Sequence, residues 1–185
     1  ADVAGQKAVR AVLNAMVNNH EIPTGLLFAG ERGTGKTTMG RILAAALNCE
    51  ATARPCGHCP SCKATFSGAS LTVLEVDAAS NGTAADIRRL MDSLRYTVGG
   101  NYRVVLLDEA HSMSNAAFNA ILKDLEEPPA QTVFVLLTTE PHKIPDTVRS
   151  RLMYFEFKPI SDQDLIGRLE YIAAAEQLPH EPDLW

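Results

Sequence analysis

Residues 30–37, GERGTGKT, fit the spacing GxxxxGK[ST], which is typical of loops that bind nucleotide phosphates. They follow an apolar run at residues 25–30 and open a helical pattern over residues 36–48, which is the context that the motif requires. Glycines in such a loop let backbone N–H groups point at phosphate oxygens, and the helix dipole adds attraction. A glycine-rich turn before an ordinary helix is the alternative. The residues assigned to nucleotide binding here are Gly30, Gly33, Thr34, Gly35, Lys36, Thr37 and Thr38.

Three side chains of this loop have separate expected tasks. The Lys36 ammonium would reach the β and γ phosphates, and the Thr37 hydroxyl would ligate Mg²⁺. The neighbouring Thr38 could contact the α phosphate. The motif therefore predicts ATP with Mg²⁺ as the ligand.

A second half of such a site is expected at the end of another strand, and residues 104–111, VVLLDEAH, supply it. Asp108 would hold Mg²⁺ through water, and Glu109 would polarise the attacking water. Neighbouring residues of an extended chain point to opposite faces, so we expect the two carboxylates to perform different tasks. A solvated acidic turn is the alternative.

All four cysteines of the chain lie within residues 49–62, spaced C-x6-C-x2-C-x2-C. Four thiolates at this spacing predict a closed, tetrahedral and structural Zn²⁺ site. A disulfide and an iron–sulfur cluster are the alternatives, and a reducing compartment disfavours the disulfide. His58 lies inside the segment, but four thiolates fill the coordination shell and we interpret it as a loop residue. The zinc ligands are therefore predicted to be Cys49, Cys56, Cys59 and Cys62.

Two further segments carry polar residues that could act on phosphate. Residues 138–140, TTE, end an apolar run with two hydroxyls, and residues 144–152 place Arg149 and Arg151 on an expected short helix. A lone arginine on a helix is most often solvated or ion-paired.

The apolar runs that must position these residues alternate with helical patterns. Strands that are apolar on both faces and alternate with helices predict an open α/β fold with a parallel sheet covered on both sides. Ligands of such sheets bind at the carboxyl ends of the strands. The expected strands are 25–30, 72–76, 103–107, 132–137 and 152–157, and the expected helices are 3–17, 36–48, 83–95, 115–126 and one that Ser161 caps.

Composition limits the classes of protein that fit. The chain has 185 residues, and a net charge of −5 argues against a surface that is nucleic-acid-binding throughout. Apolar runs fall well short of the roughly 20 residues that cross a bilayer, and a secretory leader pattern is missing. We therefore expect a soluble, cytoplasmic protein without a membrane partner.

Together, the phosphate loop, the cysteine segment, DAASNG, LLDEAH, NAILKDLEEPP, LTTEPHKIP and RSR resemble the gamma/tau ATPase subunits of bacterial DNA polymerase III clamp loaders. These subunits are AAA+ P-loop ATPases, and the resemblance covers essentially the whole chain in order. Each motif alone is generic, whereas the cysteine segment combined with LEEPP and the Ser-Arg pair is specific. The resemblance implies ATP-driven loading of a sliding clamp onto primed DNA, together with other loader subunits in a ring.

The resemblance also implies roles for individual residues. Lys36, Thr37, Asp108 and Glu109 correspond to the ATPase centre of that family. Thr139, with Thr138 as the second choice, corresponds to the γ-phosphate sensor. Arg151 corresponds to the arginine finger that acts in trans on the ATP of a neighbouring subunit. Val3 to Gln6, with Val3 and Gln6 as the contacts, corresponds to the adenine-binding segment. The helices that begin near Gly82 and Asn115 correspond to those that track the DNA backbone.

The resemblance implies two domains and some departures from the family. Residues 1–160 would form the AAA+ core with the zinc module 49–62, and residues 161–185 would begin a helical lid. The usual SRC reads SRL, and the first cysteine gap is short. The second lid sensor and the collar domain have no counterpart in these residues, so we expect clamp loading only in a longer chain.

Other assignments remain open on the sequence. A non-hydrolysing delta-prime-like scaffold subunit shares the cysteine module and the LEEPP region, although Lys36, Thr37 and Glu109 speak against it. A viral or plasmid-encoded loader of the same type and a nucleotide-gated binding module without meaningful turnover are the others.

Overall fold

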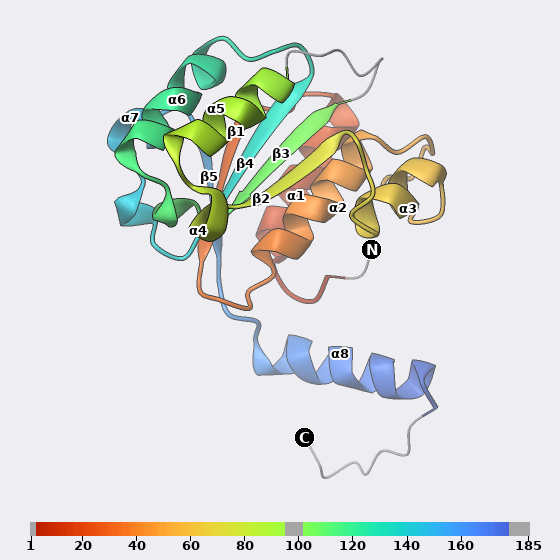
Figure 1. Ribbon diagram of the computed structural model, residues 1–185. Coiled ribbons are helices and arrows are strands. Elements are labelled where there is room, and N and C mark those ends of the chain that lie inside the picture. The colour runs from red at the N-terminus through yellow and green to blue at the C-terminus, as the bar shows by residue number, and fades with distance from the viewer. Residues whose placement is uncertain (1–2, 95–101, 178–185) are drawn as a thin grey trace.

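Five parallel strands form the centre of the computed structural model, which describes residues 3–94 and 102–177 (Figure 1). The spatial order of the strands is β2-β3-β4-β1-β5, so β1 lies between the last two strands of the chain. Strands β1, β3 and β4 are buried along almost their whole length, as the continuous apolar runs predict. The bounds are Gly25–Gly30 for β1, Val73–Asp77 for β2, Arg103–Asp108 for β3, Thr132–Thr138 for β4 and Met153–Phe157 for β5.

Helices cover both faces of this sheet, as expected for an α/β fold (Figure 1). One core cluster joins the sheet to α1 and α2, and a second joins it to α5 and α6 on the other face. The helices are α1 Lys7–Asn19, α2 Lys36–Leu47, α3 Pro60–Phe66, α4 Ala78–Asn81, α5 Ala84–Ser93, α6 Asn115–Glu126, α7 Asp146–Arg149 and α8 Asp162–Ala175, with single 3-10 turns η1 Ala110–Ser112 and η2 Pro141–Lys143.

The first helix begins later than the apolar pattern predicts. We expected it to start at residue 3, but α1 starts at Lys7. Gly5 and Gln6 have φ values of 68° and 51°, in the left-handed region, which is incompatible with continuing the helix toward the N-terminus. Val3 nevertheless packs against the core cluster of α1 and α2, which accounts for its apolar character.

The last helix, α8, stands apart from the sheet in Figure 1. Ser161 caps it as predicted, because its hydroxyl accepts the N–H of Asp164 at 3.2 Å. A surface ion pair of 3.3 Å joins Lys7 of α1 to Asp164, and solvent screening makes such pairs weak. Within the described residues, no helix combines the length and apolar character that crossing a membrane requires.

Candidate functional site

The loop between β1 and α2 has the backbone that a phosphate cradle needs. Gly33 and Gly35 adopt φ values of 83° and 92°, which side chains rarely allow, and a Cβ at either position would meet open space. Glycine is therefore required at both positions because of the left-handed backbone. A lack of space for a side chain is not the reason. Gly30 differs, because a Cβ there would lie 2.2 Å from the carbonyl oxygen of Phe157 on β5. Its glycine character serves strand packing, although its carbonyl takes part in the loop.

The Lys36 ammonium is held by this loop. Its Nζ donates to the carbonyl oxygens of Gly30 and Glu31, both at 2.8 Å. Burial lowers the pKa of Lys36, and the negative charges of Glu109 and Asp108 partly oppose that shift. The ammonium is thus placed at the N-terminus of α2, where phosphate oxygens could replace the two carbonyls as acceptors.

A contact between Thr37 and Asp108 joins this loop to the end of β3. The Thr37 hydroxyl donates to Asp108 Oδ2 at 2.7 Å, and Asp108 Oδ1 accepts the N–H of Glu109 at 2.8 Å. A hydroxyl beside a carboxylate is an oxygen donor set that suits Mg²⁺. A hollow of about 340 Å³ opens at this contact and is lined by Arg32, Gly33, Gly35, Lys36, Thr37, Thr38, Asp108 and Glu109.

Glu109 reaches the hollow differently from our expectation. We predicted that an extended chain separates Asp108 and Glu109, but β3 ends at Asp108 and Glu109 has φ 47° and ψ 42°. That expectation was wrong, because a left-handed turn, and not strand alternation, aims the two carboxylates differently. A non-glycine residue in this region costs on the order of 1–3 kcal/mol, a strain typical of functional positions.

Strand β4 ends at the first of the two threonines, Thr138, and Thr139 follows it outside the strand. Strand β4 alternates, with Phe134 and Leu136 in the α5–α6 cluster and Val135 and Leu137 in the α1–α2 cluster. Thr138 continues the first set and is buried, with its hydroxyl 3.1 Å from His111 Nδ1. Thr139 follows directly after the end of β4 and is half-buried, so strand alternation does not fix the direction of its side chain.

Gln6 lies between the loop and the segment that leads to α8. Its Nε2 donates to the carbonyl oxygen of Thr34 at 3.2 Å and to that of Lys158 at 2.6 Å. Val3 is tied to α1, because Arg10 donates to its carbonyl oxygen at 2.9 Å. The segment proposed to contact adenine therefore borders the phosphate loop.

Residues 5–161, which include all of the strands, match the model of the family described as DNA polymerase III, delta subunit. The chain belongs to this family. The matched residues include the phosphate loop, the acidic end of β3 and all four cysteines.

Curated relatives named as tau subunits of DNA polymerase III are similar to nearly the whole chain. The chain is 43% identical to DNA polymerase III subunit tau of Bacillus subtilis over 183 residues, covering 97% of this chain and 32% of the relative. It is 42% identical to subunit tau of Escherichia coli over 185 residues, covering 98% and 29%. The chain thus spans about a third of the length of these curated relatives and resembles the gamma/tau subunits, as predicted.

Solved structures confirm the AAA+ fold of this DNA polymerase III family member. The DNA polymerase III gamma subunit-related protein of Thermotoga maritima aligns with a TM-score of 0.57 and 23% identity, covering 90% of this chain and 53% of that one. The RuvB Holliday junction branch migration motor of the same organism aligns with 0.65 and 18%, covering 94% and 52%. At these identities the likeness concerns the fold alone.

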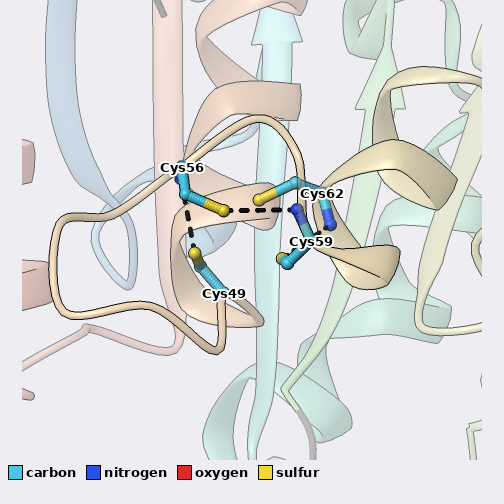
Figure 2. A group of neighbouring side chains, drawn as sticks. All are labelled: Cys49, Cys56, Cys59 and Cys62. Atoms are coloured by element: carbon cyan, nitrogen blue, oxygen red, sulfur yellow. Dashed lines mark hydrogen bonds between the residues drawn. The ribbon is translucent and has the colours of Figure 1, made fainter.

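The four cysteines come together, as Figure 2 shows, from the loop that follows α2 and from α3, which contains Cys62. Their sulfur atoms all lie within 4.8 Å of one another, and none forms a disulfide. A tetrahedral zinc with Zn–S bonds of about 2.3 Å would require S–S separations of about 3.8 Å, so the cluster fits such an ion with a small contraction. His58 is exposed and its Nδ1 lies 2.9 Å from the Cys56 carbonyl oxygen, in agreement with its interpretation as a loop residue.

Backbone N–H groups already point at three of these sulfurs. Cys49, Cys56 and Cys59 accept from the N–H groups of Cys56, Cys59 and Cys62 at 3.3–3.4 Å. Hydrogen bonds from Glu50 and Cys62 lower the pKa of the Cys59 thiol to about 6, whereas burial raises the pKa of Cys62 to about 12. N–H groups that stabilise thiolates are what a thiolate-bound metal needs around it.

We predict one tightly held Zn²⁺ per chain, because the four sulfurs satisfy its coordination number. Elemental analysis of protein purified under reducing conditions should find one equivalent, and Cys59→Ser should lower that value and the stability of the segment. His58→Ala, which removes the other potential ligand of the loop, should retain the full equivalent. A metal-free protein or a native disulfide would contradict the site.

Arg151 lies at the opposite edge of the sheet from the phosphate loop. We expected it on a short helix, but α7 ends at Arg149 and Arg151 follows the capping residue. Its carbonyl oxygen would lie 3.2 Å from a Cβ at Gly25, which begins β1, whereas the phosphate loop starts at the other end of that strand. Five steps along a strand span about 17 Å, so the guanidinium cannot reach the phosphates of its own loop.

Three residues without a predicted role contact the candidate site residues. Glu126 at the end of α6 forms an ion pair with Arg151, and the Arg151 guanidinium also donates to the Thr147 carbonyl. His111 contacts Glu109 in the acidic turn and Thr138 at the end of β4. Glu140 contacts the other nitrogen of the His111 ring. All three lie inside quoted motifs, LEEPP, LLDEAH and TTE, but their contacts depend on turns that periodicity does not predict.

Proposed function

We propose that this chain is the ATP-binding and ATP-hydrolysing region of a clamp-loader subunit of the gamma/tau type. The observation that carries the proposal is the 2.7 Å contact between Thr37 and Asp108, which joins the phosphate loop to the acidic end of β3. The similarity to subunits named tau supports this type of subunit. A longer protein that contains this region would act with other loader subunits in the cytoplasm, opening a sliding clamp and loading it onto primed DNA.

The residues of the hollow would share the work of phosphoryl transfer. Lys36 would exchange its two carbonyl acceptors for phosphate oxygens, which form stronger, charge-assisted hydrogen bonds. Thr37 and Asp108 would hold Mg²⁺, which neutralises phosphate charge when bound. Glu109 would orient and deprotonate the attacking water, and Thr139 would contact the γ-phosphate.

We further propose the division and accessory sites predicted above. Residues 1–160 form the ATPase core, and residues 161–185, which the structure describes as far as residue 177, begin a lid. Gln6 joins the phosphate loop to Lys158, in the segment that leads to this lid. The cysteine segment 49–62 is a structural zinc module. Val3 and Gln6 border the adenine, and the starts of α5 and α6, capped by Thr83 and Ser114, face primed DNA.

A non-hydrolysing scaffold subunit of the delta-prime type is the second candidate. The family description that matches this chain names a delta subunit, which favours it. However, the chain retains Lys36 in the loop and Glu109 at the hollow, and a scaffold needs neither. Turnover therefore separates the two candidates.

The decisive experiment is a Mg²⁺-dependent ATPase assay of the full-length protein assembled with its partner subunits. We expect hydrolysis that increases when primed DNA and clamp are added together. ATP binding without turnover in every combination would favour the scaffold or a nucleotide-gated switch.

Lys36→Ala should weaken nucleotide binding, because it removes the one ammonium that lies in the phosphate loop. Charged hydrogen bonds contribute about 1.5–3 kcal/mol, so we expect the affinity to fall on the order of 10- to 100-fold and ATP-dependent clamp loading to be lost. Titration with a fluorescent ATP analogue measures the affinity. Lys123→Ala, an exposed lysine in the last turn of α6, is the control and should bind normally. Normal affinity and turnover in Lys36→Ala would contradict the site.

A further inference from the structure

We propose that His111 is a positioning residue that couples the sensor segment 138–140 to Glu109. The inference rests on the proposed ATPase function and adds to it a link between sensing of the γ-phosphate and placement of the general base. It also assigns a task to a histidine that the phosphate site itself does not use.

The His111 ring contacts both of the elements that it would couple. Its Nδ1 lies 3.5 Å from Glu109 Oε2 and 3.1 Å from the Thr138 hydroxyl, and its Nε2 lies 3.4 Å from Glu140 Oε1. The side chain is only 15% exposed, so these contacts are made in a protected environment. Nδ1 therefore contacts both the base and the sensor segment, whereas Nε2 contacts the sensor segment alone.

The sensor residue lies between the two residues that His111 contacts in this segment. Thr138 and Glu140 are joined by a hydrogen bond from the Glu140 N–H to the Thr138 hydroxyl at 3.0 Å. Lys143 on η2 holds the Glu140 carboxylate at 2.9 Å and keeps the pKa of that group low. A shift of Thr139 toward a phosphate must therefore move the groups that hold the imidazole.

The Glu109 carboxylate depends on this contact more than on any other. In residues 3–94 and 102–177, the His111 ring is the only ion-pairing or hydrogen-bonding partner that we find for its oxygens. The Glu109 side chain is 39% exposed, and its charge also attracts the Lys36 ammonium, but the His111 ring is the contact that joins it to the sensor segment. A carboxylate that must meet a water within hydrogen-bond reach needs such a restraint.

His142 offers a matched control for the experiment. It contacts the same Glu140 carboxylate at 3.8 Å, but it is 73% exposed and has no contact with Glu109. The full-length protein in its assembled loader, with primed DNA and clamp, is measured as wild type, His111→Ala, His111→Gln and His142→Ala. Steady-state kcat, nucleotide affinity and the melting temperature are recorded for each.

We expect kcat of His111→Ala to fall on the order of 10²-fold, because small misplacements of a catalytic group have costs of this size. Nucleotide affinity and melting temperature should stay near wild type, and His142→Ala should be unchanged. His111→Gln, which keeps an amide within reach of both elements, should recover part of kcat. If His111→Ala does not fold, the comparison of His111→Gln with wild type carries the same test.

A double-mutant cycle distinguishes coupling from a general structural role. In a Glu109→Gln background, His111→Ala should cause no further loss of hydrolysis, because it acts through Glu109. Additive losses, a fall in affinity matching that in kcat, or an unchanged kcat in His111→Ala would each overturn the proposal. If Glu109→Gln itself leaves hydrolysis intact, the proposed ATPase site fails, and with it the coupling.

Discussion

Arg151→Ala should lower DNA-stimulated ATP hydrolysis by the assembled loader on the order of 10³- to 10⁵-fold, the range known for arginine fingers that act in trans. The planar and permanently charged guanidinium suits a transferring phosphoryl group. Its position at the start of β1, about 17 Å from the phosphate loop along the strand, excludes action on its own site. Nucleotide binding by the isolated subunit should therefore be unchanged.

Arg149→Ala is the matched control for this result. Arg149 lies two residues earlier, is also exposed and pairs with Asp146 of its own helix, so its loss should leave hydrolysis near wild type. Mixed assemblies provide the sharper comparison, because a Lys36→Ala subunit with an intact Arg151 should still support hydrolysis at its neighbour. An assembly whose hydrolysis is indifferent to Arg151, or an isolated Arg151→Ala subunit that binds nucleotide weakly, would show that the arginine does not act in trans.

Glu109→Gln should reduce kcat on the order of 10²- to 10⁴-fold while nucleotide affinity is retained. The amide preserves the shape and the contact with the hollow, but it cannot accept a proton from water. Single-turnover hydrolysis together with ATP titration separates these two effects. Glu156→Gln removes an exposed carboxylate on β5 that pairs with Lys158, and it should leave both values unchanged. Loss of binding in Glu109→Gln would instead assign this residue a structural role.

The sequence predicts the layers and strands of this fold well because its central strands are continuously apolar. The expected strand at 132–137 is β4 with one residue added, and the expected helix at 115–126 is α6 itself. The loop at Lys36 and the cysteine segment were also predictable, since each motif acts over a short stretch of chain. Their geometry is therefore largely local.

Backbone turns and contacts between distant elements account for what the sequence did not predict. Left-handed φ at Gln6 and Glu109 shortened the first helix and redirected an acidic side chain, and apolar periodicity carries no signal for either. The need for glycine at position 30 arises from Phe157, which is 127 positions later in the chain. His111 and Glu126 likewise act through side chains whose partners only the folded chain brings close.

The proposed action of Arg151 in trans would also restrict the symmetry of assembly. With the arginine at one end of the strands and the phosphate loop at the other, each site would be completed only by heterologous, head-to-tail contact. A closed ring of such contacts would complete every site, whereas an open arc would leave the terminal phosphate loop without its arginine. On this proposal, an arc would have one active site fewer than it has chains, so opening or closing the ring by itself would switch one site off or on.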